Sequence, residues 1–150
     1  MTRGGRPPSG SCRSLRGAAT VEFALVSLVF LALVIGVVEF SRLMLIYASA
    51  VEATRYGARV AVVCSVGDSA VVKTRMRSIL SLLQPENISI SYPGAGCSAS
   101  TCNPVTVTIQ NLRVQAVIPF VPMTFQVPAF TTSLPAETLD STDNVLCEGG

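Results

Sequence analysis

The sequence predicts an α+β fold with a long N-terminal helix, a second short helix and a small antiparallel β-sheet. Two patterns lead to this class. The stretch Phe23–Val38 is apolar and carries no charge, and the residues that follow Pro85 alternate between apolar and polar side chains. The first pattern is typical of a membrane-spanning helix and the second of half-buried strands.

The segment 1–17 is a basic leader that we expect to form a cytoplasmic tail. It contains four arginines and no acid: Arg3, Arg6, Arg13 and Arg16. Positively charged flanks of a spanning helix stay on the cytoplasmic side, which places the rest of the chain on the opposite side. Residues 1–16 are also rich in Gly, Pro and Ser and lack an apolar period, so the sequence predicts that they are disordered.

Residues 18–38 are predicted to form the spanning helix. At about 1.5 Å per residue they cover about 30 Å, which is the thickness of the hydrocarbon core. A cleaved signal peptide is the nearest alternative, because Ala48–Ala50 fits the small-x-small rule for cleavage. The apolar run is longer than the roughly 7 to 15 residues of a signal peptide, and Glu39 and Arg42 intervene. A stable anchor is therefore favoured.

The helix is expected to continue outside the membrane through residues 39–63. No proline occurs between Pro8 and Pro85, so nothing ends the helix at the membrane surface. Two pairs of opposite charges are spaced three residues apart, which places them side by side on a helix: Glu39 with Arg42, and Glu52 with Arg55. Small residues on another face, Gly57 among them, allow close packing against a second surface.

Residues 64–150 are predicted to form a small α+β domain outside the membrane. Ser69 is expected to cap a second helix over Ala70–Leu83, which Pro85 ends. Alternating side chains predict antiparallel strands at 88–92 and 105–110, joined by a turn-forming loop.

Further strands are expected toward the C-terminus. Residues 112–116 either extend the second strand or form another after a bulge, and Phe125–Leu134 supplies one more. The tail from Pro135, which contains Asp140 and Asp143, is expected to be flexible unless Cys147 fastens it.

Four cysteines would lie outside the membrane, with Cys12 left in the cytoplasmic tail. They are Cys64, Cys97, Cys102 and Cys147. An oxidising compartment favours disulfides, and four cysteines permit three pairings among which the sequence does not choose. A local bridge across the loop from Cys97 to Cys102 would leave Cys64 to join Cys147. A zinc site is the alternative, but the chain has no histidine and the CxxxxC spacing matches zinc motifs poorly.

Enzymatic chemistry and nucleic-acid binding are both disfavoured, and no cofactor, metal or catalytic residue is expected. There is no histidine, no GxSxG elbow and no phosphate-binding glycine loop. Beyond Gly17 seven basic residues face nine acidic ones, which does not favour contact with nucleic acid. Asp140 and Asp143 are interpreted as solvated residues of the tail.

Glu22 places a carboxylate near the start of the apolar run. The positive end of the helix dipole stabilises a carboxylate there by roughly 0.3 to 1 kcal/mol, which is one explanation of its position. The other is a cation from a neighbouring helix. A cut after Gly17 would give Ala18 a free amine one helical turn before Glu22.

The N-terminal third contains Leu15-Arg16-Gly17, the following AATVEFAL with its long apolar helix, and the segment EATRYGARVAV at Glu52–Val62. In these residues it resembles the TadE-like minor pseudopilins of the tight-adherence (Flp/Tad) type IV pilus system. The resemblance implies a pilin-like fold with cleavage between Gly17 and Ala18 by a membrane prepilin peptidase. Glu22 and Phe23 would form the processing and assembly motif.

The resemblance implies a structural role in initiating, priming or capping a Tad-type pilus, for adhesion or secretion. The expected partners are the prepilin peptidase, other pilins and minor pseudopilins, the inner-membrane assembly platform and the lipid bilayer. The expected location is the bacterial inner membrane, with a single pass, a cytoplasmic N-terminus and possible incorporation in a pilus. The alternative is an uncleaved single-pass protein whose outer domain binds a partner or ligand.

Overall fold

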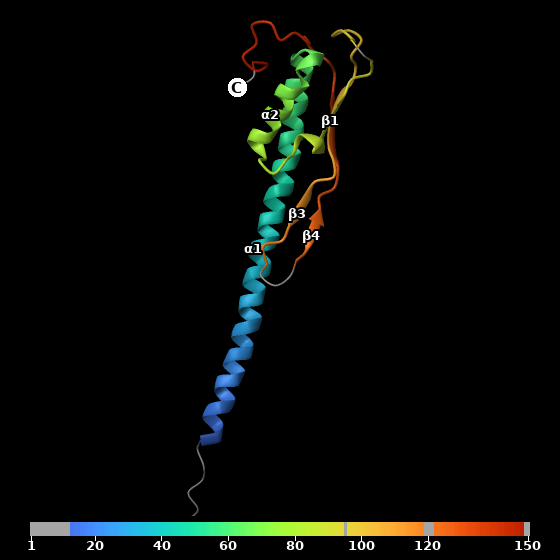
Figure 1. The fold of residues 1–150 in the computed structure, drawn as a ribbon. Coiled ribbons are helices and arrows are strands. Elements are labelled where there is room, and N and C mark those ends of the chain that lie inside the picture. Colours follow the sequence, from blue (N-terminus) through green and yellow to red (C-terminus); the bar gives the residue numbers. More distant parts are fainter. Residues whose placement is uncertain (1–12, 95, 119–121, 149–150) are drawn as a thin grey trace, which may run out of the picture. The chain divides into compact units, whose positions relative to one another are not determined.

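The computed structural model describes residues 13–94, 96–118 and 122–148 (Figure 1). The expectations for the leader that concern residues 1–12, including Cys12, lie outside the described residues. The chain divides into two compact units, one ending at Val38 and the other beginning at Glu39. Each unit is described by itself.

Helix α1 (Arg13–Val63) contributes to both units and confirms the predicted end at Val63. In the first unit its side chains are almost all exposed, including the large apolar ones from Val21 to Val38. From Gly17 the helix is long and apolar enough to cross a membrane, and its most apolar window has a mean hydropathy of 2.7. Exposed apolar side chains around a whole helix are typical of a segment surrounded by lipid or by other helices.

The second unit packs the outer part of α1 against a shorter helix, α2 (Ser69–Ile79), and the strands. Two 3-10 turns, η1 (Val66–Asp68) and η2 (Pro85–Asn87), flank α2. Residues of α1 that face this core follow each other at three- and four-residue steps, and Cys64, directly after the helix, continues the series: Leu43, Ile46, Ala50, Ala53, Gly57 and Ala61. This spacing keeps one side of the helix toward the domain.

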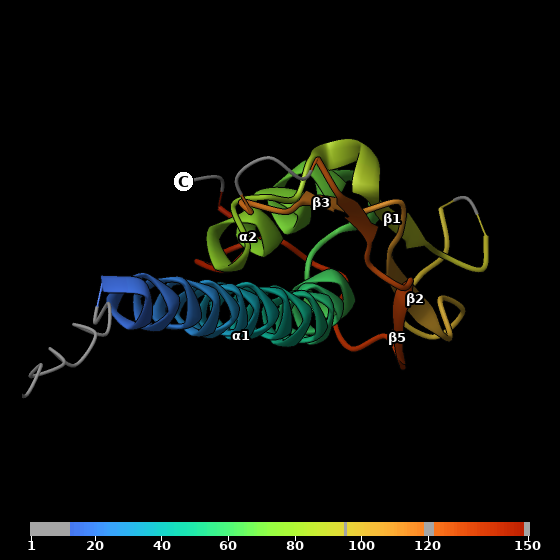
Figure 2. The same ribbon diagram turned by 90° about the horizontal axis from the view of Figure 1, so that it is seen from below.

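Two small antiparallel sheets complete the unit and confirm the α+β class. The first has the order β1-β2-β5, with β1 at Ile88–Ser91, β2 at Val105–Ile109 and β5 at Phe130–Leu134 (Figure 2). The second pairs β3 (Arg113–Gln115) with β4 (Thr124–Gln126).

The central strand β2 shows why the alternating pattern was informative. Val105, Val107 and Ile109 are fully buried, whereas the threonines between them lie on the other face. Thr106 forms a hydroxyl–hydroxyl hydrogen bond of 2.8 Å with Ser133, and Thr108 forms one of 3.2 Å with Thr131. The apolar face therefore supplies the core, and the polar face is linked across the β2–β5 pair.

Four details differ from the sequence-based expectations. Helix α1 begins at Arg13, so residues 13–16, which were expected to belong to the disordered leader, are helical. Ser69 lies inside α2 rather than capping it, and the helix ends at Ile79 instead of Leu83. Leu80 turns to an extended conformation that buries its side chain, so burial outweighs helix propensity there. The single strand expected within Phe125–Leu134 is two strands, β4 and β5, which belong to different sheets.

Candidate functional site

The residues of the predicted processing motif lie on the exposed surface of α1 in the first unit. Glu22 is exposed, and 73% of Phe23 is accessible. Among the described residues, the Glu22 carboxylate has no ion-pair or hydrogen-bond partner. A side chain placed at Gly17 would meet no atom within 4 Å. No contact within the described part of the chain therefore accounts for these residue types.

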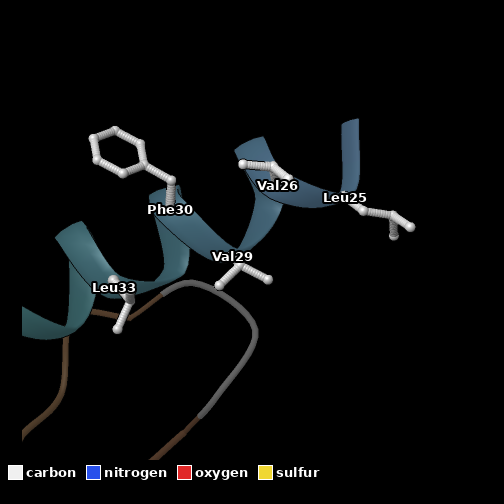
Figure 3. Close-up of a pocket in the computed structure, with 5 residues that line it drawn as sticks. All are labelled: Leu25, Val26, Val29, Phe30 and Leu33. Carbon is white, nitrogen blue, oxygen red and sulfur yellow. The ribbon is translucent and has the colours of Figure 1, made fainter. Parts of the chain in front are cut away.

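The same surface continues along the apolar part of α1. Five side chains line a shallow hollow without a polar atom (Figure 3): Leu25, Val26, Val29, Phe30 and Leu33. They lie at three- and four-residue steps, which is the spacing by which one helix packs against another or against lipid chains. This surface suits apolar packing and offers no group for catalysis.

A protein-family comparison identifies this part of the chain. The family model described as TadE-like protein matches residues 17–59. This segment is similar to TadE-like proteins. The match confirms the resemblance found in the sequence and indicates a component associated with the Tad pilus, a structural rather than catalytic family. No curated protein and no solved structure matches the chain.

The TadE-like segment begins at Gly17, the residue expected to precede the cut, and ends at Arg59 within α1. It therefore contains Glu22, Phe23 and the first residues of the second unit. The remainder of the second unit, from Val60 onward, lies outside the match.

A charged clamp joins α1 to the β3–β4 hairpin where the second unit begins. Arg42 Nη2 donates to Glu39 Oε1 at 2.6 Å, which confirms the predicted pairing of these residues. The same nitrogen donates to the backbone oxygen of Gln115 at 2.6 Å, and the Val117 N–H donates to Glu39 Oε1 at 3.4 Å. The hydrogen bonds from Arg42 are the main cause that lowers the pKa of Glu39, against the opposing effect of burial.

The other predicted pair behaves differently. Glu52 and Arg55 are both exposed, and in the part of the chain that the structure describes no ion pair joins them. The two pairs differ in their surroundings. An ion pair between exposed side chains adds little stability, because water solvates the separated charges almost as well. The hairpin that fixes Glu39 and Arg42 has no counterpart at Glu52. Sequence spacing alone did not distinguish the two pairs.

The C-terminal segment 135–148 covers the end of α1. The backbone N–H of Glu137 donates to the Val62 oxygen at 3.0 Å, and the N–H of Asp140 donates to the Val63 oxygen at 2.9 Å. The last carbonyls of a helix have no partner within the helix. The segment therefore acts as a cap supplied by a distant part of the chain.

Two further contacts hold this cap. Cys64 and Cys147 form a disulfide across a Cα–Cα distance of 5.5 Å, so Cys147 fastens the tail. Arg75 of α2 donates to the backbone oxygens of Val145 at 3.3 Å and Glu148 at 3.2 Å. Arg75, a basic residue of α2, thus takes part in holding the tail.

A small polar network lies where α1 turns into η1. The Ser65 N–H donates to the Ser141 hydroxyl at 2.9 Å, and the Ser141 N–H donates to the Ser65 hydroxyl at 3.1 Å. The Ser141 hydroxyl donates to the Asp68 carboxylate. The hydrogen bonds of Ser141 link the cap to the residues where α1 turns into η1, which is a structural use of polar groups.

Tyr92 is affected by the same region. Burial raises the pKa of its hydroxyl, and the negative charge of Asp68 adds a smaller effect in the same direction.

The second cysteine pair lies in the β1–β2 connection. Cys97 and Cys102 form a disulfide with a Cα–Cα distance of 5.1 Å, inside the loop predicted to join two strands. Among the described residues, no group of three or more His, Cys, Asp or Glu side chains is arranged to hold a metal ion. The four cysteines from Cys64 onward therefore form one long-range link and one local link within the fold.

Proposed function

We propose that the chain is a minor pseudopilin that assists the assembly of a Tad-type pilus. Three features support this role: the family match, the exposed apolar surface of α1 and the motif residues, which lie exposed among the described residues. A helix with an exposed apolar surface passes from lipid into a filament core without a large loss of hydrophobic burial. The role is therefore one of packing between subunits.

Glu22 carries the specific step of the proposal. Cleavage after Gly17 by a prepilin peptidase would liberate the Ala18 amine, and the carboxylate of Glu22 in one subunit would neutralise the amine of a neighbour. A buried charge without a partner is strongly unfavourable, so this pairing would fix the register between subunits. The absence of a partner for Glu22 within the described chain leaves its carboxylate available for this contact.

The proposed location is the bacterial inner membrane. Residues 18–38 would span it, the leader would lie in the cytoplasm and the second unit would lie outside. Partners in this role would be other pilins, minor pseudopilins and the assembly platform, with initiation, priming or capping of the fibre as the step assisted. Adhesion or secretion would be the process served.

The experiment that tests the proposal determines the N-terminus of the protein purified from membranes and from sheared surface fibres. We expect the sequence to begin at Ala18. A chain that begins at Met1 would support the alternative, in which an uncleaved anchor carries a binding domain. A start at Val51 would indicate a cleaved signal peptide and a secreted domain.

A further inference from the structure

Strand β5 forms one edge of the three-stranded sheet (Figure 2). In an antiparallel pair, alternate residues direct their backbone N–H and C=O groups away from the partner strand. Among the described residues, no hydrogen bond reaches the outward groups of Phe130–Leu134. The strand contains no charged residue and no proline, which are the residue types that commonly protect an edge from pairing. The outer edge of β5 is therefore open to another strand.

The two faces of β5 indicate which side chains an added strand would carry. Phe130, Thr132 and Leu134 lie opposite the three buried residues of β2, so they share the face that is directed to the core. Thr131 and Ser133 lie on the other face, where their hydroxyls bond to the threonines of β2. Side chains of a neighbouring strand continue the character of each face. The suitable strand therefore alternates apolar and hydroxyl side chains, as β2 does.

A cavity of about 480 Å³ lies where β5 ends, between α1 and the C-terminal cap. Leu146 lines it and is 46% exposed. Arg59 and Glu137 line it as well, and in the described chain neither of these exposed side chains forms an ion pair. Opposite charges beside an apolar cavity complement an occupant that inserts an apolar side chain and carries the matching charges. The other apolar side chains of the cavity wall include Val60, Val63 and Leu134.

We propose that this edge binds an extended segment of another polypeptide, which adds a strand antiparallel to β5 and places an apolar side chain in the cavity. In such strand additions the main-chain hydrogen bonds supply affinity, and pockets for alternate side chains supply specificity. The segment carries an acidic residue toward Arg59 and a basic residue toward Glu137. Strand β1 forms the other edge of the sheet, but the cavity beside it is lined mainly by polar side chains.

This inference goes beyond the proposed pilus role and concerns the second unit alone. It requires neither cleavage after Gly17 nor a particular location of the chain. A failure of strand binding would therefore leave the proposed function intact, and an uncleaved N-terminus would leave the strand site intact.

The test measures binding of a fluorescent peptide to the full chain in detergent by fluorescence anisotropy. The peptide is Glu-Lys-Val-Thr-Val-Thr-Ile, which contains the alternating sequence of β2. Two control peptides carry N-methyl groups, one on the valines and the isoleucine and the other on the threonines. Because a strand at an edge uses every second N–H, only one of the two should lose binding. Equal behaviour of the two methylated peptides would contradict strand addition.

Two pairs of protein variants locate the bound peptide. Leu146→Asp places a charge in the cavity, and Val145→Asp is its matched control because Val145 does not line the cavity. Arg59→Glu reverses the charge beside the cavity, and Arg55→Glu is its control one helical turn away. Circular dichroism shows that each variant keeps its fold.

We expect Leu146→Asp to weaken binding about tenfold or more, the effect of losing one buried apolar contact, and Val145→Asp to leave it unchanged. Arg59→Glu should weaken binding, and a peptide with lysine in place of its glutamate should restore it. Hydrogen exchange should slow in Phe130–Leu134 when the peptide is bound. The proposal is wrong if no saturable binding occurs, if both aspartate variants bind equally, or if only β1 is protected from exchange.

Discussion

Gly57 of α1 and Met76 of α2 lie in such close contact that a methyl group on Gly57 would overlap the Met76 thioether. Met76 is fully buried, so it has little room to move aside. Gly57 lies within the TadE-like segment and Met76 lies outside it. The contact is thus a direct link between the family segment and the rest of the outer unit.

We predict that Gly57→Ala destabilises the outer unit by about 1 to 3 kcal/mol, the usual cost of overpacking a core. Thermal and denaturant unfolding of the detergent-solubilised chain measures the change. Gly67→Ala is the matched control, because a side chain there meets no atom within 4 Å. Combining Gly57→Ala with Met76→Ala should cost less than the sum of the two single changes. Additive costs would show that the two residues do not compete for the same space.

The clamp between Glu39, Arg42 and the hairpin gives a second prediction. Arg42→Gln removes the charge and the bond to the Gln115 oxygen, so the hairpin should open more often. Hydrogen exchange followed by mass spectrometry should show faster exchange in peptides that contain Val114–Val117, with little change in β1 and β2. Arg55→Gln is the control, since Arg55 is exposed and forms no ion pair among the described residues. Equal exchange in the two variants would argue against the clamp.

The two disulfides are predicted to differ in their effect on stability. The Cys64–Cys147 bridge joins residues 83 positions apart, whereas Cys97–Cys102 joins residues 5 apart. Loop-closure entropy therefore predicts a cost of about 4 to 5 kcal/mol for removing the first and about 2 kcal/mol for the second. Paired serine variants, unfolded with denaturant under non-reducing conditions, give both values. Mapping by mass spectrometry checks the connectivity, and a cross-link between Cys64 and Cys97 would contradict it.

Glu22→Gln tests the proposed role of the carboxylate. The change keeps the shape of the side chain and removes its charge, so the Ala18 amine of a neighbour would lose its counter-ion. We expect a folded, membrane-inserted protein whose recovery in sheared fibres falls well below that of the unmodified chain. Glu52→Gln changes another exposed carboxylate of α1 and should be recovered normally. Normal recovery of Glu22→Gln would show that assembly does not need the charge.

Local patterns in the sequence determined much of this protein. The uncharged run predicted the exposed apolar part of α1, the lack of proline predicted that the helix continues beyond this run, and alternating side chains predicted β1 and β2. These features depend on neighbours a few positions apart, which the sequence displays directly. The motif around Gly17 and Glu22 was visible for the same reason.

Tertiary structure decided which distant groups meet. The pairs Glu39–Arg42 and Glu52–Arg55 have the same spacing in the sequence. In the structure they differ, because Arg42 also donates to the Gln115 oxygen of the hairpin. The pairing of Cys64 with Cys147 and the capping of Val62 and Val63 by the C-terminal segment likewise join residues more than 70 positions apart. Such contacts follow from how several elements pack at once, and no local period records that packing. The sequence by itself thus determined the elements and the family segment, and the packed structure determined how the outer unit is fastened to its helix.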